Sequence, residues 1–445
     1  MATLAICVWT MRSEINGALR LARTWSRAGH QVCFVGVCDG RQIVVDNGFR
    51  YLAVLEDILP VGSIGIEEPQ TGQQGTARLW RLREAFRRKR RFERILMDLA
   101  RSEGNPVEAA LRTLRPDLVI VGTHSPHPNV FALIAARMGI RCAYLSQLAL
   151  MSVDPRRRRA RAWQQSLWQV KRLWRRLAPS PFRINYHKIF RVYLDATGLA
   201  PEQLNYDDRM YPLRRPILYP WPQAFELPGF DRPNVLTVEA GVEVDRHEEP
   251  VQLPPLAGRS AFVFCSFGSL LPLGVDRTRR LLREVIGAAR LLPDVQMTVA
   301  VGPYFEVSEF GVPPVNVYLC RHAPQLSMLK LADMMITHGG SGSTRECLML
   351  GVPMIVVPLG YESDLYAERV DHHGLGLRAD WRELTAAMLA RMIQQVRDEP
   401  RYRAAAARMR AAFEDCERRR PSIDAIEQCL ATPIGTSSAA VREVA

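Results

Sequence analysis

One stretch of the chain, Thr337–Glu346, combines glycines with polar side chains in a spacing suited to a phosphorylated ligand. An apolar run ends at Ile336, a glycine-rich turn follows, and a helical pattern begins within two or three residues. A strand–turn–helix of this kind directs backbone N–H groups and a helix N-terminus at an anion. His338 and Ser343 add side-chain donors there, and Glu346 lies one turn into the helix, within reach of a sugar hydroxyl. The stretch therefore predicts a site for a diphosphate joined to a ribose.

A parallel sheet must position such a turn, and the chain shows the necessary alternation of elements twice. Short apolar runs alternate with helical patterns, which is typical of parallel sheets covered by helices on both faces. In the first half we expect strands at Leu4–Val8, Gln31–Gly36, Leu118–Val121 and Arg141–Leu145. In the second half we expect strands at Ala261–Phe264, Met297–Val301, Val315–Leu319, Met334–Ile336 and Met354–Val357. The pattern predicts an α/β protein with two doubly wound, Rossmann-like domains.

A Pro- and Gly-rich stretch, Tyr219–Pro255, separates the two sets of elements. We therefore expect an N-terminal domain over residues 1–225, a linker over 226–258 and a C-terminal domain over 259–420. Residues 421–445 are expected to form a C-terminal helix and a tail that frays from about Thr432.

Composition argues against several classes of protein. No apolar run approaches the ~18–20 residues needed to span a bilayer, and Met1–Thr10 lacks the basic region and cleavage site of a signal peptide. The nine cysteines are scattered without a Cys-x-x-Cys pair, so we expect neither a disulfide framework nor a zinc site. The expected location is the reducing cytoplasm.

The motifs resemble those of the UDP-glycosyltransferase superfamily, which has the GT-B fold, and especially its bacterial branch acting on natural products and lipids. The most specific match is Thr337–Glu346; Arg321–Gln325 is similar to the base-recognition segment, and Ser266–Ser269 to the first loop of the nucleotide domain. Ala28–Val32 and Arg115–Ile120 are similar to elements of the N-terminal domain. The resemblance covers nearly the whole chain and implies two Rossmann-like domains facing across a cleft.

On the nucleoside side of the donor, the resemblance implies a role for each matching residue. Gln325 would hydrogen-bond the base, with the turn that begins at His322 packed against the ring. Glu346 would accept hydrogen bonds from the ribose hydroxyls, and Asp364 would contact the donor sugar. The glutamine that follows this acid in the family is Leu365 here, which leaves the identity of the sugar open.

On the diphosphate side, His338 would contact the phosphates, and Ser269 would approach them from the facing loop. The other contacts would be backbone N–H groups and one hydroxyl at the start of the helix, from Gly340, Ser341, Gly342 and Ser343. Gly342 replaces the family's usual asparagine. The enzymes it resembles use no metal and no cofactor, since donors and a helix dipole stabilise the leaving diphosphate while the sugar carbon is inverted.

The acceptor side departs from the family. A histidine base usually lies just before the first helix, but Ser13–Asn16 places Glu14 there, and the partner aspartate is replaced by Gly122. A carboxylate screened from water can act as a base, and an acid in the first turn of a helix is also favoured by the helix dipole alone. His124 and His127, just past the strand, are alternative bases.

Most of the formal charge of +13 lies in two basic segments, Trp80–Ile95 and an insert at about 151–180. In the insert, Trp and Leu recur every three to four residues between basic residues, so Arg156–Arg176 fits a helix at an anionic membrane surface. A helix packed on the domain at the acceptor site, with a solvated charged face, fits the pattern slightly better. Nucleic-acid binding is not expected, because the aromatic spacing is helical and no nucleic-acid fold motif occurs.

The sequence thus predicts inverting transfer of a sugar from a UDP- or dTDP-linked donor to a hydroxyl of a hydrophobic small molecule or lipid. Two alternatives stay open: a catalytically silent partner protein that keeps the fold, and a nucleotide-sugar epimerase. The expected location is cytoplasmic, with peripheral association at the inner membrane face.

Overall fold

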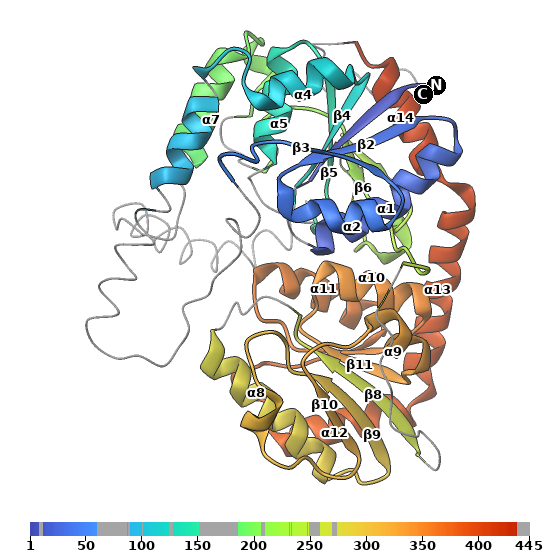
Figure 1. Cartoon of the computed structure of the whole chain (residues 1–445). Coiled ribbons are helices and arrows are strands. Elements are labelled where there is room, and N and C mark those ends of the chain that lie inside the picture. The colour runs from blue at the N-terminus through green and yellow to red at the C-terminus, as the bar shows by residue number, and fades with distance from the viewer. Residues whose placement is uncertain are drawn as a thin grey trace.

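The computed structural model has two α/β domains, one above the other (Figure 1). It describes residues 1–8, 12–59, 87, 90–99, 101–123, 128–150, 186–205, 210–230, 232, 234–246, 248, 259–268 and 274–433. Within these ranges, no helix combines the length and apolar content needed to cross a bilayer.

The N-terminal domain is built on a seven-stranded parallel sheet in the order β3-β2-β1-β4-β5-β6-β7. Its strands are β1 (Thr3–Cys7), β2 (Gln31–Gly36), β3 (Arg50–Ala53), β4 (Leu118–Gly122), β5 (Arg141–Leu145), β6 (Ile217–Tyr219) and β7 (Val235–Thr237). Its helices are α1 (Arg12–Arg27), α2 (Arg41–Asp46), α4 (Pro106–Leu114), α5 (Asn129–Arg137) and α7 (Tyr186–Ala196).

The C-terminal domain repeats this plan with six parallel strands in the order β10-β9-β8-β11-β12-β13. Its strands are β8 (Ala261–Ser266), β9 (Val295–Ala300), β10 (Val317–Cys320), β11 (Met334–Thr337), β12 (Met354–Val356) and β13 (Gly376–Arg378). Its helices are α8 (Val275–Arg290), α9 (Gln325–Leu331), α10 (Ser341–Leu350), α11 (Tyr361–His372), α12 (Ala386–Asp398) and α13 (Pro400–Arg419). The predicted fold of two doubly wound sheets is confirmed.

Each sheet has one place where the chain reverses its direction of travel across the sheet: between β1 and β4 in the first, and between β8 and β11 in the second. At such a point the loops leaving two adjacent strands diverge, one to each face, and open a crevice at the carboxyl ends. The loop after β11 is the glycine-rich turn of the sequence motif, and Gly122 ends β4. Both halves of the predicted site therefore lie at these two points.

The strands predicted from apolar runs are confirmed, and the differences concern shorter elements. Helix α1 begins at Arg12, which places Glu14 in its first turn. β3, β6, β7 and β13 were not predicted. Because β7 lies at Val235–Thr237, part of the segment predicted as a linker is the edge strand of the N-terminal sheet.

A shared core joins the two domains. Trp221, which follows β6, stacks on Tyr366 of α11 with ring centroids 4.8 Å apart. Beside them, Arg369 of α11 donates to Glu226 with a 2.6 Å Nη2–Oε2 distance, and both side chains are 1% exposed. Tyr219 also donates to Glu226, at 2.6 Å. These contacts fix α11 against the segment that follows the N-terminal sheet.

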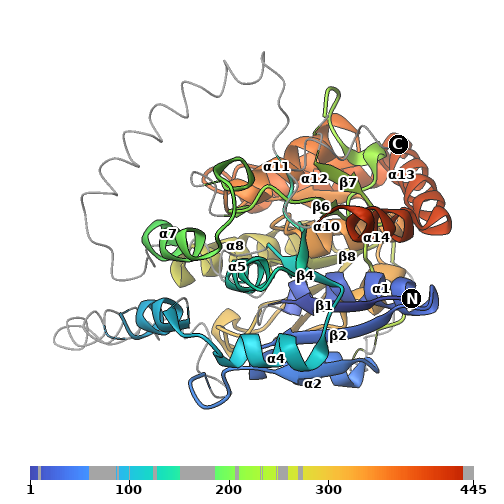
Figure 2. The same cartoon turned by 90° about the horizontal axis from the view of Figure 1, so that it is seen from above.

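The last two helices run back across both domains. α13 is a 20-residue helix that packs against α10, and it extends along the side of the molecule (Figure 1). After Arg420, α14 (Pro421–Ala431) lies on the N-terminal domain, in contact with α1, β5 and β7 (Figure 2). The chain therefore passes between the domains a second time.

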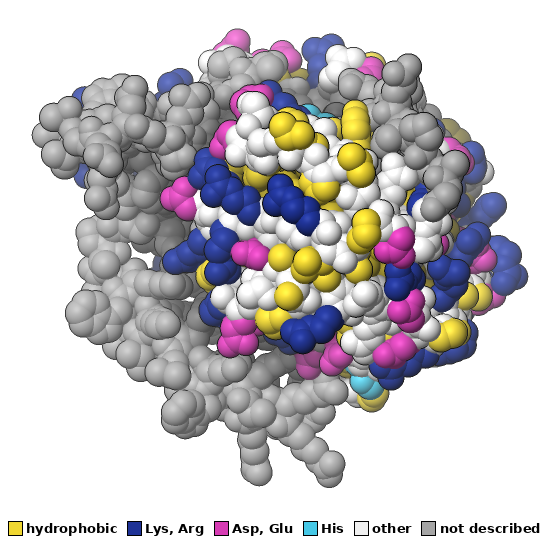
Figure 3. All heavy atoms as spheres, turned by 90° about the horizontal axis from the view of Figure 1, so that it is seen from below, with side chains coloured by type: hydrophobic (Ala, Val, Ile, Leu, Met, Phe, Trp, Pro, Cys, Tyr) yellow, Lys and Arg dark blue, Asp and Glu magenta, His cyan; other side chains and the backbone are white. Residues whose placement is uncertain are grey.

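The face of the C-terminal domain that is turned away from the N-terminal domain carries Lys and Arg interspersed with Asp and Glu, and scattered apolar side chains (Figure 3). Among the described residues, apolar exposure includes Val312 and Val315 in the loop before β10. Since the charges alternate in sign, this face has the character of an ordinary solvated surface.

Candidate functional site

The turn between β11 and α10 has the backbone form of an anion site. Gly339 adopts φ +75°, and a Cβ there would lie 2.6 Å from Val356 Cγ1, so both conformation and space require glycine. Gly340 is extended and begins α10, and no described side chain caps that helix. The first N–H groups of a helix have no partner within it, so those of α10 are available to an anion.

His338 lies at the heart of the turn, enclosed by two glycines. A Cβ on Gly268, in the loop after β8, would lie 2.7 Å from its ring, and a Cβ on Gly340 would lie 2.5 Å away. Burial lowers the pKa of His338 to about 4. The ring is therefore neutral at pH 7, and among the described residues its Nδ1 has no hydrogen-bond partner. A neutral imidazole keeps one N–H with which to donate to a phosphate oxygen.

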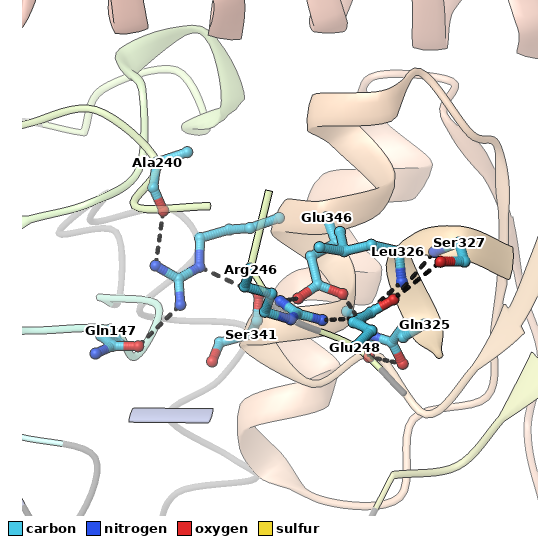
Figure 4. Close-up of polar contacts among 11 residues, drawn as sticks. Gln147, Ala240, Arg246, Glu248, Gln325, Leu326, Ser327, Ser341 and Glu346 are labelled. Carbon is cyan, nitrogen blue, oxygen red and sulfur yellow. Dashed lines mark hydrogen bonds and ion pairs between the residues drawn. The ribbon is translucent and has the colours of Figure 1, made fainter. Parts of the chain in front are cut away.

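The structure brings three predicted donor-site residues into direct contact. Gln325, at the start of α9, donates from Nε2 to Ser343 Oγ at 3.1 Å. The same nitrogen donates to Glu346 Oε2 at 2.5 Å. The residues predicted to contact the base, the phosphates and the ribose thus form one cluster, in which Gln325 of α9 reaches Glu346 of α10 (Figure 4). His322, predicted to begin the base-packing turn, is exposed.

Two charged residues of the segment before β8, Arg246 and Glu248, also belong to this cluster. Their participation was not predicted from the sequence. Arg246 donates from Nη1 to Glu346 Oε1 and from Nη2 to Glu248 Oε1, the latter at 2.9 Å. Glu248 in turn accepts from the backbone N–H groups of Leu326 and Ser327, each at 3.1 Å. Both charged side chains lie within the predicted linker, where composition gave no signal of a partner.

On the acceptor side, Glu14 is fully buried beside Gly122. A Cβ on Gly122 would overlap Glu14 Oε1 and lie 2.9 Å from its Cδ. The carboxyl group of Glu14 therefore fills the space that a side chain at position 122 would need. Glu14 and Gly122, the two residues that depart from the family's pattern, are therefore structurally coupled, because only glycine at position 122 leaves space for the Glu14 carboxyl group.

A buried arginine links the two halves of the site. Arg345, next to Glu346 and 2% exposed, donates to Gln147 Oε1 at 2.9 Å and to the carbonyl of Ala240 at 2.8 Å (Figure 4). Gln147, which follows β5, donates from Nε2 to the carbonyl oxygen of Glu14 at 2.7 Å. Gly17 permits this approach, since a Cβ there would lie 2.6 Å from Gln147 Cδ. The helix that carries the phosphate turn is thus tied to the turn that carries Glu14.

Comparisons with known proteins agree with this geometry. Residues 294–422 match the family "Erythromycin biosynthesis protein CIII-like, C-terminal domain". NDP-glycosyltransferase YjiC of Bacillus subtilis is 38% identical over 101 residues, 23% of this chain and 26% of that protein. The oleandomycin glycosyltransferase of Streptomyces antibioticus is 26% identical over 70% of this chain and 68% of its own. These matches support the placement of the chain in the UDP-glycosyltransferase superfamily.

Solved structures place the whole chain in the same fold. The glycosyltransferase of kitacinnamycin has a TM-score of 0.71, with 21% identity over 96% of this chain and 99% of that chain. The glycosyltransferase VinC, solved in complex with dTDP, has a TM-score of 0.62, with 18% identity over 96% of this chain and 99% of its own. The match to the first curated relatives spans only about a quarter of their length, 26% in each of the first two.

Two acidic residues, Glu362 and Asp364, lie in the first turn of α11. Asp364 is 46% exposed and pairs with Arg378 at 2.6 Å on the outer side of the helix. Glu362, two residues earlier and on another face of the helix, accepts from Tyr366 at 3.2 Å near Arg345. Burial raises the pKa of Glu362 to about 7, against the opposing effects of the Tyr366 hydrogen bond and the Arg345 charge. Glu362 therefore shares a face of α11 with Tyr366, whose hydroxyl contacts the N-terminal domain at Gln147 and Ala149.

Some predicted site residues lie outside the part of the chain that the structure describes: Ser269, His124, His127 and the insert with Arg156–Arg176. Gly340, Ser341 and Gly342 lie in the phosphate turn as predicted from the motif. Within the described ranges, no group of three or more His, Cys, Asp or Glu could hold a metal ion.

Proposed function

We propose that this chain is an inverting, metal-independent glycosyltransferase that uses a UDP- or dTDP-linked sugar. The observation that carries the proposal is the cluster of Gln325, Ser343 and Glu346 beside the uncapped start of α10 and a neutral His338. This cluster offers a base-reading amide, N–H groups for a diphosphate and a carboxylate for the ribose. The dTDP bound to VinC supports a nucleoside diphosphate as the ligand.

The proposed reaction is a single displacement at the anomeric carbon of the sugar. The acceptor hydroxyl loses its proton to a base as its oxygen bonds to that carbon, and the bond from the carbon to the diphosphate oxygen breaks on the opposite face. The N–H groups of Ser341–Ser343 and the imidazole of His338 stabilise the negative charge that develops on the diphosphate. Exclusion of water between the domains prevents hydrolysis of the donor.

We propose Glu14 as the first candidate base, with His124 and His127 as alternatives. Glu14 lies at the N-terminal switch point, and its helix is tied to the donor helix through Gln147 and Arg345. Glu14→Gln keeps the shape and removes the proton acceptor. Transfer activity should fall by roughly 10²–10⁴-fold if Glu14 is the base, and unchanged turnover removes it from the mechanism and transfers the test to His124→Ala and His127→Ala.

The proposed acceptor is a hydroxyl of a hydrophobic small molecule or lipid. Similarity to the oleandomycin glycosyltransferase supports a natural-product acceptor, and the tryptophan-containing basic insert supports a lipophilic one. Peripheral association with an anionic membrane through Arg156–Arg176 is proposed as well. Salt-sensitive binding to anionic vesicles, lost on deletion of residues 156–176, is the expected result, and binding that survives the deletion contradicts it.

The experiment that tests the proposal is thermal unfolding of the full chain with nucleotides and nucleotide sugars. A ligand at ~100 times its dissociation constant adds ~2.7 kcal/mol to the free energy of unfolding. UDP or dTDP is expected to raise the melting temperature, and Gln325→Ala and Glu346→Ala are expected to lower that effect. No stabilisation by either nucleotide contradicts the proposal. Incubation with the donor sugar alone should leave its configuration unchanged, and isomerised sugar would indicate an epimerase.

A further inference from the structure

Glu346 uses both of its carboxylate oxygens, but its two partners differ in kind. Oε2 accepts from the neutral amide of Gln325 at 2.5 Å, while Oε1 accepts from the guanidinium of Arg246 (Figure 4). Rotation of the amide toward a bound base would release Oε2. The Arg246 bond joins opposite charges in a largely buried place, where such hydrogen bonds are strong.

Arg246 makes further contacts that fix its position beside Glu346. Its second nitrogen donates to Glu248 at 2.9 Å, and Glu248 is anchored by two backbone N–H groups at the start of α9. At the other end of the same turn, Arg246 N–H donates to the carbonyl of Glu243 at 3.3 Å, and the Glu243 carboxylate accepts from Arg23 of α1 at 2.7 Å. Withdrawing Arg246 from Glu346 would therefore disturb contacts to both domains.

We infer that Arg246 is a specificity-determining residue that selects a 2′-deoxyribose in the donor nucleotide. This inference rests on the proposed function, in which Glu346 faces the ribose. A ribose presents two adjacent hydroxyl donors, which a carboxylate meets best with one oxygen for each. With Oε1 already bonded to the Arg246 guanidinium, only Oε2 is left without a charged competitor. A 2′-deoxynucleotide brings only the 3′-hydroxyl, whereas the second hydroxyl of a ribonucleotide must share Oε1 with Arg246 and forms a weaker hydrogen bond.

Isothermal titration of the full chain with matched nucleoside diphosphates tests the inference. UDP against 2′-deoxy-UDP, and 5-methyl-UDP against dTDP, each differ by the 2′-hydroxyl alone. We expect the deoxy form of each pair to bind about tenfold more tightly, the order of effect for one weakened hydrogen bond to a charged group. A ribo form that binds as tightly as its deoxy partner overturns the inference. Failure of all four to bind overturns the proposed function with it, so the two outcomes are distinguishable.

Substitutions then assign the selectivity to one side chain. Arg246→Gln should bring the ribo-to-deoxy ratio of dissociation constants close to one, because Oε1 loses its charged competitor. Glu248→Gln, which loosens the anchor while keeping Arg246, should lower the ratio part of the way. The control is Arg403→Gln. It removes an exposed arginine of α13 that pairs with Asp333, and it should keep the wild-type ratio. A ratio that stays at the wild-type value in folded Arg246→Gln and Glu248→Gln overturns the assignment.

Discussion

The carboxyl group of Glu14 and the missing side chain of Gly122 are complementary in space. The two residues lie on α1 and at the end of β4, and any Cβ at position 122 would overlap the buried carboxylate. In the superfamily the two positions are expected to hold a histidine and an aspartate. Here the Glu14 side chain extends into the space that an aspartate at position 122 would occupy. The chain therefore keeps a carboxylate beside the end of β4, although residue 122 itself is glycine.

This complementarity predicts how the two positions respond together. Gly122→Ala should lower the free energy of unfolding by about 1–3 kcal/mol, the usual cost of overpacking a filled interior. Glu14→Ala should remove that penalty, so the double variant Glu14→Ala/Gly122→Ala should be more stable than the sum of the single changes predicts. Chemical denaturation of the four proteins measures the coupling. Additive effects would show that the two side chains do not share this space.

Positions 14 and 122 can be changed together to the residues that the family usually has there. Glu14→His/Gly122→Asp supplies a histidine and an aspartate where the resemblance expects them, and it should retain measurable transfer. Gly122→Asp alone places a second carboxylate against Glu14, where like charges and overpacking both oppose folding. The ratio kcat/KM should therefore be higher in the double variant than in either single one. The opposite order would argue that position 14 and position 122 act independently.

Arg345 is expected to stabilise the junction of the domains. Arg345→Met leaves the acceptors Gln147 Oε1 and Ala240 O without their donor, at about 1–3 kcal/mol for each buried group. Arg345→Lys should recover only part of this, because a single ammonium cannot reproduce the guanidinium's two separated donors. The matched control is Arg403→Met, an exposed pair that should change stability by no more than about 1 kcal/mol. Equal stability of the two Met variants would contradict this role.

The lowered pKa of His338 predicts a specific pH dependence of stability. The folded protein holds the ring neutral down to pH ~4, whereas an unfolded histidine binds a proton near its ordinary value of about 6.5. Between these values the unfolded state binds more protons, so stability rises with pH. Relative to His338→Phe, the wild type should lose on the order of 2 kcal/mol as the pH falls from 6.5 to 4. Exposed His322, changed to Phe, should leave the wild-type profile intact; parallel profiles for wild type and His338→Phe would refute the neutral buried ring.

Glu362 and Asp364 predict a contrast in kinetics. Glu362→Gln removes a carboxylate that lies beside Tyr366 and near Arg345, and it should lower kcat/KM for the donor by at least about tenfold. Asp364→Asn removes only the outer ion pair with Arg378, so its effect should stay within about threefold. Both substitutions keep the side-chain shape. The reverse order of effects would return the donor-sugar contact to Asp364.

The parts of the fold that were predictable are those with strong local signals. β4 is buried along its whole length, and an uninterrupted apolar run such as Leu118–Val121 reveals that in sequence. β6 and β7 have three residues each and form by pairing with β5 and with each other. Their existence depends on a sheet assembled from distant segments, which no local pattern in the linker encodes.

For the site, the motif predicted the phosphate turn but not its surroundings. Gln325, Ser343 and Glu346 converge because β10, β11 and the loops after them follow the doubly wound plan. Arg246 and Arg345 act through long-range contacts, and a single arginine in sequence does not show whether it faces solvent or an acid. Gly122 appeared in sequence as a lost residue, whereas in three dimensions it is the space that Glu14 needs.

Since α14 returns to the N-terminal domain, the chain cannot be cut into two complete domains at a single point. Because α14 contacts α1, β5 and β7, a fragment ending in the segment before β8 would lack part of the covering of its own sheet, and the remaining fragment would expose the apolar side of α14. Exchange of donor modules between relatives therefore needs two splice points, one before β8 and one between α13 and α14. Any relative rotation of the domains must likewise bend the chain at both of these crossings at once.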